Sequence, residues 1–338
     1  MLDIVVTTAL VVILAAVGIS GAFVGLAYLL WYMAERRALA PEGQAPQQAV
    51  PEAAATAVQP PRPQRRPLTT PLVLAMTREY GAGAVCTIAQ AACVKQRDIR
   101  AMTVPPDEDD PLMFVHGYLE NRGVFLLLSM HLEHGFDFHY QDMINLTPPL
   151  VSIPHHAESL MKRLEDAAIN MRRERFQLIV HSMGGLVTRY ALAFLGGQAR
   201  ISRVVSLGTP HYGTTISVLS RTALGRSMRP GSEVLKALQE REAQEPGCRV
   251  PWLAVATRHD EIVTPYESAL WEHATANLVV EGTGHIGLLT NAGLADVLGG
   301  ALTMPVWHRT HLENLILPET CYWEFSENSH APSPANRT

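Results

Sequence analysis

The sequence lacks the features that mark several classes of protein. It has only four cysteines and no C-x-x-C spacing, which argues against a zinc site and leaves several disulfide pairings, or none, open. It has no internal repeat, no phosphate-binding glycine loop and no basic stripe interleaved with aromatic residues. Its formal net charge is -5, so a nucleic-acid partner is not expected. The cysteines are Cys86, Cys93, Cys248 and Cys321.

A long apolar run does occur, over residues 4–33, and no lysine or arginine precedes it. Because about 20 helical residues cross a bilayer core, the run predicts an uncleaved single-pass transmembrane helix. Gly21 and Gly25 form a small-xxx-small pattern that would let two such helices pack as a homodimer. Arg36 and Arg37 follow directly, which favours a bacterial inner-membrane protein with its folded part in the cytoplasm. The excess of positive charge is small, so a periplasmic location stays open.

Composition divides the rest of the chain. The predicted units are an anchor over residues 1–37, a linker over 38–67, a folded domain over 68–325 and a flexible tail over 326–338. The linker is rich in alanine, proline and glutamine and cannot build a core. The folded domain opens with a helical lead-in over residues 68–104. Arg78 and Glu79 lie inside this lead-in and argue against a second membrane span.

One serine stands between a short apolar strand and a helix. Phe176–Val180 has the length and composition of a strand buried on both faces of a parallel sheet, and helical apolar spacing starts at Leu186. Ser182 lies between them in the run L-I-V-H-S-M-G-G. The two glycines that follow at 184 and 185 let the strand and the helix approach closely. The serine oxygen would then stand at a helix N-terminus, where free amides favour negative charge.

This motif resembles the nucleophile elbow of α/β-hydrolases, in the His-Ser-Met-Gly-Gly form of bacterial lipases and esterases. The resemblance spans about residues 110–303 and implies an α/β-hydrolase fold, with a mostly parallel sheet flanked by helices. The family pattern G-x-S-x-G has glycine two residues before the serine, and this chain has Val180 there. A β-carbon at that position can crowd the turn. A tight strand-to-helix turn without catalysis is the alternative for the motif taken alone.

Two further motifs follow apolar strands. Leu112–Val115 leads into His116-Gly117, which resembles the His-Gly pair after the third strand of lipases. By that resemblance the amides of Tyr118 and Met183 form the oxyanion hole. His116 itself is expected to be structural. Another strand, Val204–Leu207, ends in the run G-T-P-H-Y-G-T, which resembles a lipase signature after the sixth strand. Its histidine, His211, precedes every plausible catalytic acid, whereas the hydrolase order is serine, acid, histidine, so it too is expected to be structural.

The acid and the base are expected after two later strands. Asp260 follows the apolar strand Trp252–Ala256, and His285 follows Leu278–Val280 in a glycine-rich loop. This is the serine, acid, histidine order of α/β-hydrolases, and catalytic groups gather at the carboxyl ends of parallel strands. The catalytic residues are therefore predicted to be Ser182, Asp260 and His285. The nearby carboxylates Glu261 and Glu267 are expected to be solvated, Asp296 to lie on a helix, and His273, His308, His311 and His330 to lie outside the site.

The connection over residues 208–250 is long for this fold and has helix-like pieces, such as Ser232–Arg241. Such insertions often act as lids, so a helical lid is predicted here. Leu219, Leu224 and Met228 would either face an acyl chain or pack the lid onto the body, and packing is favoured.

Together these features predict a membrane-anchored serine hydrolase that cleaves carboxylic esters, such as lipid or acyl esters, through an acyl-enzyme. No cofactor and no metal is expected. Two alternatives stay open: an acyltransferase on the same fold, and a membrane scaffold that has lost catalysis. The sequence does not determine acyl length, headgroup or oligomeric state.

Overall fold

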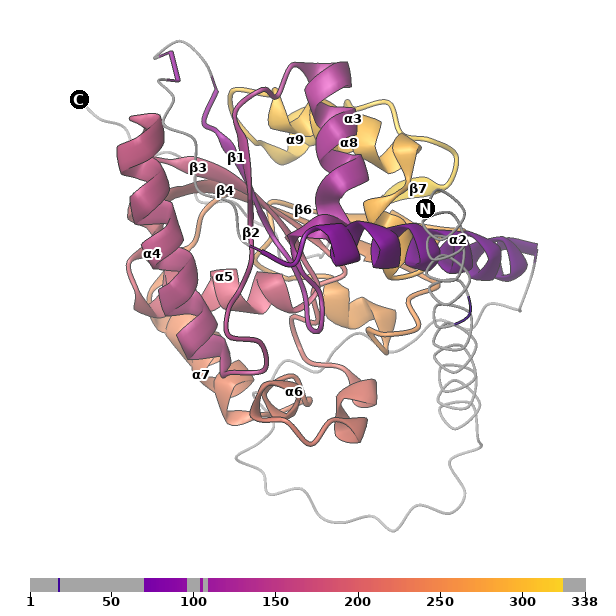
Figure 1. Cartoon of the computed structure of the whole chain (residues 1–338), viewed down its shortest axis with the longest axis horizontal. Helices are drawn as coiled ribbons and strands as arrows, with labels where there is room; N and C mark the ends of the chain where they lie inside the picture. Colours follow the sequence, from indigo (N-terminus) through magenta and orange to yellow (C-terminus); the bar gives the residue numbers. More distant parts are fainter. Residues whose placement is uncertain (1–17, 19–69, 96–103, 106–108, 325–338) are drawn as a thin grey trace, which may run out of the picture.

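A computed structural model of the chain describes residue 18 and residues 70–95, 104–105 and 109–324 (Figure 1). The linker over 38–67, the tail over 326–338 and all of the anchor except Gly18 lie outside the described residues, so their predicted properties are not tested. In the described ranges, every helix is too short or too polar to cross a membrane.

The described domain is built on a seven-stranded sheet in the order β2-β1-β3-β4-β5-β6-β7. The first six strands in this order are parallel, and β7 pairs with β6 in the antiparallel direction. The strands are β1 (Leu112–Val115), β2 (Gln141–Ile144), β3 (Phe176–His181), β4 (Ile201–Leu207), β5 (Trp252–Thr257), β6 (Ala276–Val280) and β7 (Cys321–Glu324). The predicted mostly parallel sheet is confirmed. All five strands predicted from apolar runs are present in it.

Helices cover both faces of this sheet, as Figure 1 shows. Each face therefore has its own core, which explains why β3 and β5 are mostly apolar and are buried along their whole length. One face packs against α4 (Ile153–Met171), α5 (Met183–Phe194), α6 (Ala223–Ser227) and α7 (Glu233–Gln244). The other packs against α3 (Leu126–Phe136), α8 (Ala292–Leu302) and α9 (Arg309–Leu312).

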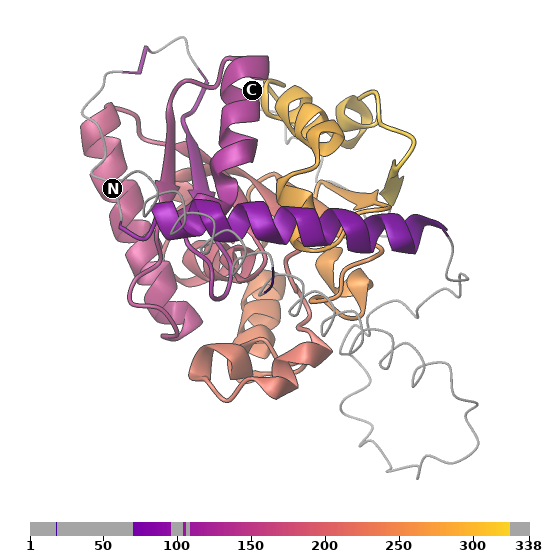
Figure 2. The same ribbon diagram turned by 45° about the vertical axis from the view of Figure 1, so that its right-hand side comes forward.

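The predicted helical lead-in contains α2 (Thr70–Ala92). In Figure 2 this helix runs across the front of the domain, and it packs against two short helical turns, η2 (Arg122–Phe125) and η7 (Ile286–Leu289). The second of these turns directly follows His285. The N-terminal part of the folded domain thus contacts the segment that carries the predicted base.

The predicted lid segment, residues 208–250, contains η4 (Thr215–Leu219), α6 and α7. Leu224 and Met228 are buried in the core shared with α4 and α5, whereas Leu219 is 63% exposed. The segment is tied to the body by a buried ion pair, in which Arg189 of α5 donates to both carboxylate oxygens of Glu242 at 2.8 and 2.6 Å. Two of the three apolar side chains singled out in the sequence therefore pack onto the body, and movement of the segment stays a prediction.

The four cysteines all lie within the described ranges, and each is a buried free thiol. Burial is the largest effect on Cys86 and raises its pKa to about 12, with Glu120 and Glu79 adding to the rise. A thiol with so high a pKa is a poor nucleophile. The four cysteines therefore form no disulfide in this structure, which settles the pairing that the sequence left open.

Candidate active site

Ser182 lies at the sharp turn between β3 and α5. Its backbone has φ 53° and ψ -124°, a region that residues with a side chain rarely adopt, and its side chain is almost fully buried. Two hydrogen bonds hold the turn: the Ser182 amide donates to the Leu207 carbonyl at 2.8 Å, and the Thr209 hydroxyl donates to the Ser182 carbonyl at 2.9 Å. Both partners belong to or follow β4. The neighbouring strand therefore holds Ser182 in a strained conformation.

Glycines make the close approach at this turn possible. A β-carbon at Gly184 would lie 2.5 Å from the carbonyl oxygen of Val115, and one at Gly185 would collide with the Thr209 side chain. A β-carbon at Gly117 would lie 2.8 Å from that of Ser182. The expectation that small residues at 184 and 185 permit close packing is thus confirmed. Val180, which replaces the family glycine, is fully buried within β3 in register with Val115.

Asp260 and His285 form a buried hydrogen-bonded pair. Asp260 follows β5, His285 follows β6, and His285 Nδ1 lies 2.9 Å from Asp260 Oδ2. The other carboxylate oxygen of Asp260 accepts the amides of Ile262 and Val263 at 2.9 and 2.6 Å. These backbone bonds fix the carboxylate, so that one oxygen is left for the imidazole. With Nδ1 donating to Asp260, Nε2 is the nitrogen that can accept a proton.

The pKa of His285 is raised above its ordinary value of 6.5. Burial is the largest single effect and lowers this pKa, but the negative charge of Asp260 and its hydrogen bond raise it, with further contributions from Glu120 and Glu79. The balance is therefore set by three surrounding carboxylates. A histidine in this setting holds a proton more firmly than a free imidazole does.

Ser182 lies at the same edge of the sheet as this pair. Leu207, which binds the Ser182 amide, is followed by Gly208, and a β-carbon there would be 3.0 Å from Cε1 and Nδ1 of His285 and 3.3 Å from Asp260 Oδ2. His181, the residue before the serine, has its ring 4.6 Å from that of His285. The structure therefore gathers all three predicted residues at the carboxyl ends of β3, β5 and β6.

The two amides predicted for the oxyanion hole lie beside Ser182. Met183 is the first residue of α5, and Tyr118 follows Gly117, which packs against the serine. Within the described part of the chain, neither amide has a hydrogen-bond acceptor. The Tyr118 hydroxyl lies 3.2 Å from those of Ser220 and Thr222, so the same residue also contacts the predicted lid segment. The oxyanion role itself stays a prediction.

A second histidine–carboxylate pair was missed in the sequence. His181 Nδ1 lies 2.9 Å from Glu120 Oε2, which also accepts the Gly117 amide at 2.6 Å. Burial raises the pKa of Glu120, but His181 and the amide outweigh it, and the pKa is lowered. His181 Nε2 lies 3.3 Å from the His285 carbonyl. The one available signal was an acidic residue within the apolar run after His116, which by itself is typical of a surface turn.

Two expectations about carboxylates were wrong. Glu261 and Glu267 were expected to be solvated, but their exposed fractions are 1% and 4%. Glu261 accepts the His285 amide at 3.2 Å and faces Glu79 of α2, a partner 182 positions away. Local sequence gives no sign of such a partner. Glu261 is therefore buried against the segment that carries His285.

The histidines expected to be structural have structural contacts. His116 Nδ1 lies 2.9 Å from the Gly117 carbonyl, and its Nε2 accepts the Leu146 amide at 2.9 Å. His211 is buried and stacks on Trp271, and burial lowers its pKa well below the ordinary value. Among the residues with described positions, no group of three or more histidine, cysteine or carboxylate side chains is arranged to hold a metal ion.

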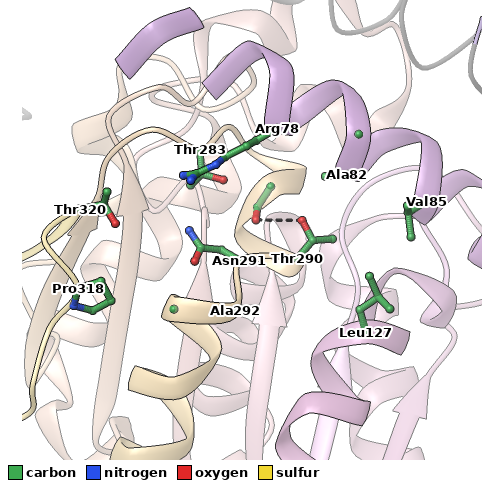
Figure 3. Close-up of a pocket in the computed structure, with 13 residues that line it drawn as sticks. Arg78, Ala82, Val85, Leu127, Thr283, Thr290, Asn291, Ala292, Pro318 and Thr320 are labelled. Carbon is green, nitrogen blue, oxygen red and sulfur yellow. Dashed lines mark hydrogen bonds between the residues drawn. The ribbon is translucent and has the colours of Figure 1, made fainter. Parts of the chain in front are cut away.

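A cavity of about 570 Å³ lies on the α2 side of the His285 loop (Figure 3). In Figure 3 the Arg78 side chain extends from α2 toward Thr283, with Thr290 and Asn291 lining the opposite side. Neither the serine nor the Asp–His pair lines it. This cavity is therefore separate from the candidate active site.

The chain is similar to one family profile and to several solved lipase structures. The family profile described as lecithin:cholesterol acyltransferase matches residues 154–292, which include Ser182, Asp260 and His285. The mature lipase BlEst2 of Bacillus licheniformis is 18% identical, with 60% of this chain and 96% of the lipase covered and a TM-score of 0.52. The propeptide form of this lipase is also 18% identical, with 64% of this chain and 54% of the lipase covered and a TM-score of 0.53.

A fungal structure is also similar. Lipase B of Aspergillus fumigatus is 16% identical, with 65% of this chain and 61% of the lipase covered and a TM-score of 0.47. No curated protein sequence matches the chain significantly. At these identities the structural likeness shows the fold and leaves the activity to be argued from the site.

Proposed function

Because the chain has the α/β-hydrolase fold found in lipases and esterases, we propose that it is a serine hydrolase of carboxylic esters. One observation carries this proposal. Ser182, on its strained turn, lies at the same sheet edge as the buried, hydrogen-bonded pair of Asp260 and His285. A nucleophile, a base and a group that orients the base are the parts that acyl transfer through a serine requires.

The chemistry follows from the contacts. His285 Nε2 takes the proton of the Ser182 hydroxyl while the serine oxygen attacks the ester carbonyl, and the amides of Tyr118 and Met183 bind the oxyanion. The protonated His285 then gives its proton to the leaving alcohol. Water attacks the acyl-enzyme in the second half, with His285 again taking and returning one proton. Asp260 holds the imidazole in the tautomer that leaves Nε2 free to accept.

Lipid or other acyl esters are the proposed substrate class, and no cofactor or metal is proposed. The support is that the structural neighbours are named lipases and that the matching profile is named for an acyltransferase of a phospholipid. Segment 208–250 is proposed as the lid over this site, since the hydroxyls of Ser220 and Thr222 contact Tyr118.

The profile match also favours a second candidate, acyl transfer to an alcohol in place of water. The first half of the reaction is identical, so the two differ only in what attacks the acyl-enzyme. Hydrolysis of a p-nitrophenyl ester in the presence of a long-chain alcohol separates them. Free acid as the main product supports the hydrolase, and a new ester as the main product supports the transferase.

A fluorophosphonate probe tests whether the chain is catalytic at all. Such probes react with an activated serine, so the full chain should become labelled at Ser182 and should release acid from esters. An inert scaffold would give neither signal. Comparing p-nitrophenyl esters of increasing acyl length then distinguishes esterase from lipase behaviour.

The raised pKa of His285 predicts the pH dependence of the reaction. His285 must be neutral to accept the serine proton, so kcat/KM should rise with pH as this imidazole loses its proton. The midpoint of that acid limb should lie above 6.5, because Asp260 and the neighbouring glutamates outweigh the effect of burial. Initial rates with one soluble ester between pH 5 and pH 9 measure it. A midpoint at or below 6.5 would contradict this assignment.

The N-terminal anchor remains a proposal based on sequence alone. The uncharged run over residues 4–33 supports a single membrane span, with residues 38–67 as a tether. Expressed in bacteria, the full chain should stay with the membrane fraction after alkaline carbonate washing, and a chain starting at residue 68 should not. Release of the full chain by the wash would refute the anchor.

A further inference from the structure

Two consecutive residues of α2 hold the loop that carries His285. Arg78 Nη1 donates to the Gly282 carbonyl at 3.1 Å. Glu79 is fully buried, and its two carboxylate oxygens accept the amides of Ile286 and Gly287 at 2.6 and 2.7 Å. The contacts thus bracket His285 on both sides along the chain. Both attachments involve a charged side chain, but Glu79 is fully buried and accepts two short bonds whereas Arg78 donates one longer bond, so Glu79 makes the firmer of the two.

The glycines of this loop make room for the carboxylate. A β-carbon at Gly284 would lie 2.5 Å from Glu79 Oε2, and one at Gly287 would lie 2.9 Å from the same oxygen. Real β-carbons do not approach so closely. The spacing G-H-I-G, which in the sequence indicates only a flexible loop, therefore matches a cradle for one side chain of a distant helix.

A second carboxyl group completes the arrangement. Glu261 accepts the His285 amide at 3.2 Å and is hydrogen-bonded to Glu79. Burial is the main cause that raises the pKa values of Glu79 and Glu261. The nearby charges of Glu79 and Asp260 raise the pKa of Glu261 further. Two carboxylates cannot both be charged here, so the pair holds one proton. Glu79 accepts two amides and Glu261 only one, which places the charge on Glu79 and the proton on Glu261.

We propose that Glu79 is a positioning residue of the active site, whose carboxylate fixes the loop of His285 while Glu261 supplies a neutral hydrogen-bonding partner. This inference rests on the proposed function, since it concerns the same base. It connects the first helix of the folded domain to the chemistry, although Glu79 touches no reacting atom. Displacing a catalytic group by about 1 Å can cost on the order of 100-fold in rate, so a loose loop would be costly.

The proposal predicts opposite results for two glutamines in the same pair. In Glu261→Gln the side-chain amide can donate to Glu79 and its oxygen can accept the His285 amide, as the protonated carboxyl does. In Glu79→Gln only one oxygen remains for two amides, and the new NH₂ group faces an N–H. We expect Glu261→Gln to keep the labelling rate within about threefold and Glu79→Gln to lose on the order of 100-fold.

The pH dependence separates positioning from a merely structural role. The charge on Glu79 contributes to the raised pKa of His285, so Glu79→Gln should move the acid limb of labelling to lower pH, and Glu261→Gln should not. The titratable and charged groups around the pair are Glu79, Arg78 and Cys86 of α2, Asp260 and Glu261 after β5, Glu120 after β1, His181 of β3 and His285. These neighbours are the same in both variants, which makes them matched controls for each other.

Thermal unfolding adds a readout that needs no activity. The folded pair holds its proton above the ordinary glutamate pKa of 4.5, where the unfolded chain has lost it, so wild-type stability falls as pH rises through this window. Glu261→Gln removes that titration. The difference between the Tm of Glu261→Gln and that of wild type should therefore shift in favour of the variant as the pH rises from 5 to 8.

The measurements are fluorophosphonate labelling rates across pH and NMR titration of the His285 ring, assigned by its loss in His285→Asn. If wild type is not labelled, the proposed function fails, and the pKa of His285 still tests the positioning role of Glu79. That pKa should fall in Glu79→Gln and stay unchanged in Glu261→Gln. Equal losses in both variants, or a wild-type rate and pKa in Glu79→Gln, overturn the proposal. If Glu79→Gln does not fold, the test rests on Glu261→Gln. A wild-type labelling rate and an unchanged acid limb of the pH dependence in this variant support the proposal, and a change in either overturns it.

Discussion

Ser182→Ala is expected to lower kcat for ester hydrolysis by roughly 10⁴- to 10⁶-fold and to abolish fluorophosphonate labelling. The reason is that the alanine methyl cannot attack a carbonyl, while the amides proposed for the oxyanion hole, those of Tyr118 and Met183, are unchanged. The residual rate should therefore exceed that of water alone. Rates with a p-nitrophenyl ester and gel fluorescence after labelling measure the two effects.

The control is Ser129→Ala. Ser129 is also a buried serine, but it lies on α3 and its hydroxyl donates to Gln141 at 2.8 Å, away from the candidate site. This variant should be labelled at the wild-type rate. Tm values of both variants should stay close to that of wild type, which would exclude unfolding as the cause. Labelling that persists in Ser182→Ala would show that another nucleophile reacts.

Asp260→Asn should cost roughly 10⁴-fold in kcat through the tautomer of His285. The carboxylate oxygen that accepts the amides of Ile262 and Val263 can be kept as the asparagine carbonyl. The new NH₂ group then faces His285 Nδ1 and makes it an acceptor, which places the ring proton on Nε2. A protonated Nε2 cannot take the serine proton. Steady-state rates at the pH optimum measure this loss.

The same substitution removes the main charge that raises the pKa of His285, so the acid limb should move to lower pH. Asp296→Asn is the matched control. Asp296 also lies 2.8 Å from a histidine, His131, but that pair is partly exposed and joins α8 to α3 on the face of the sheet opposite α5. Asp296→Asn should leave both kcat and the acid limb of the pH profile unchanged. A loss below about tenfold in Asp260→Asn would show that another carboxylate orients His285.

The sheet could be predicted because its signals are local. A strand buried on both faces is mostly apolar along its length, and β1, β3 and β5 can be recognised in the sequence by such short apolar runs. The helix after the elbow begins at Met183, earlier than the apolar spacing from Leu186 indicates, because the glycines at 184 and 185 contribute no apolar side chain to the pattern. Strands β2 and β7 were not predicted, since a short edge strand with only partial burial has no such pattern.

The carboxylates around His285 show where prediction from sequence stops. Glu79, Glu120 and Glu261 each stand in a local context that suits a solvated charge, but Glu79 and Glu261 are almost fully buried and the Glu120 side chain is only 9% exposed. Glu79 binds a loop about 200 residues away, Glu120 binds His181 of β3, and Glu79 and Glu261 bind each other. Burial of a charge depends on such distant partners, because an unpaired charge would not be buried.

By itself the sequence determined the five inner strands of the described sheet, the turn at Ser182 and the order of serine, acid and histidine, because strand burial, glycine spacing and chain order are properties of short segments. The tertiary structure alone decided which charges surround the imidazole and which helix holds its loop. Those depend on how α2 crosses the sheet edge, and packing between segments far apart in the chain leaves no mark on either segment alone.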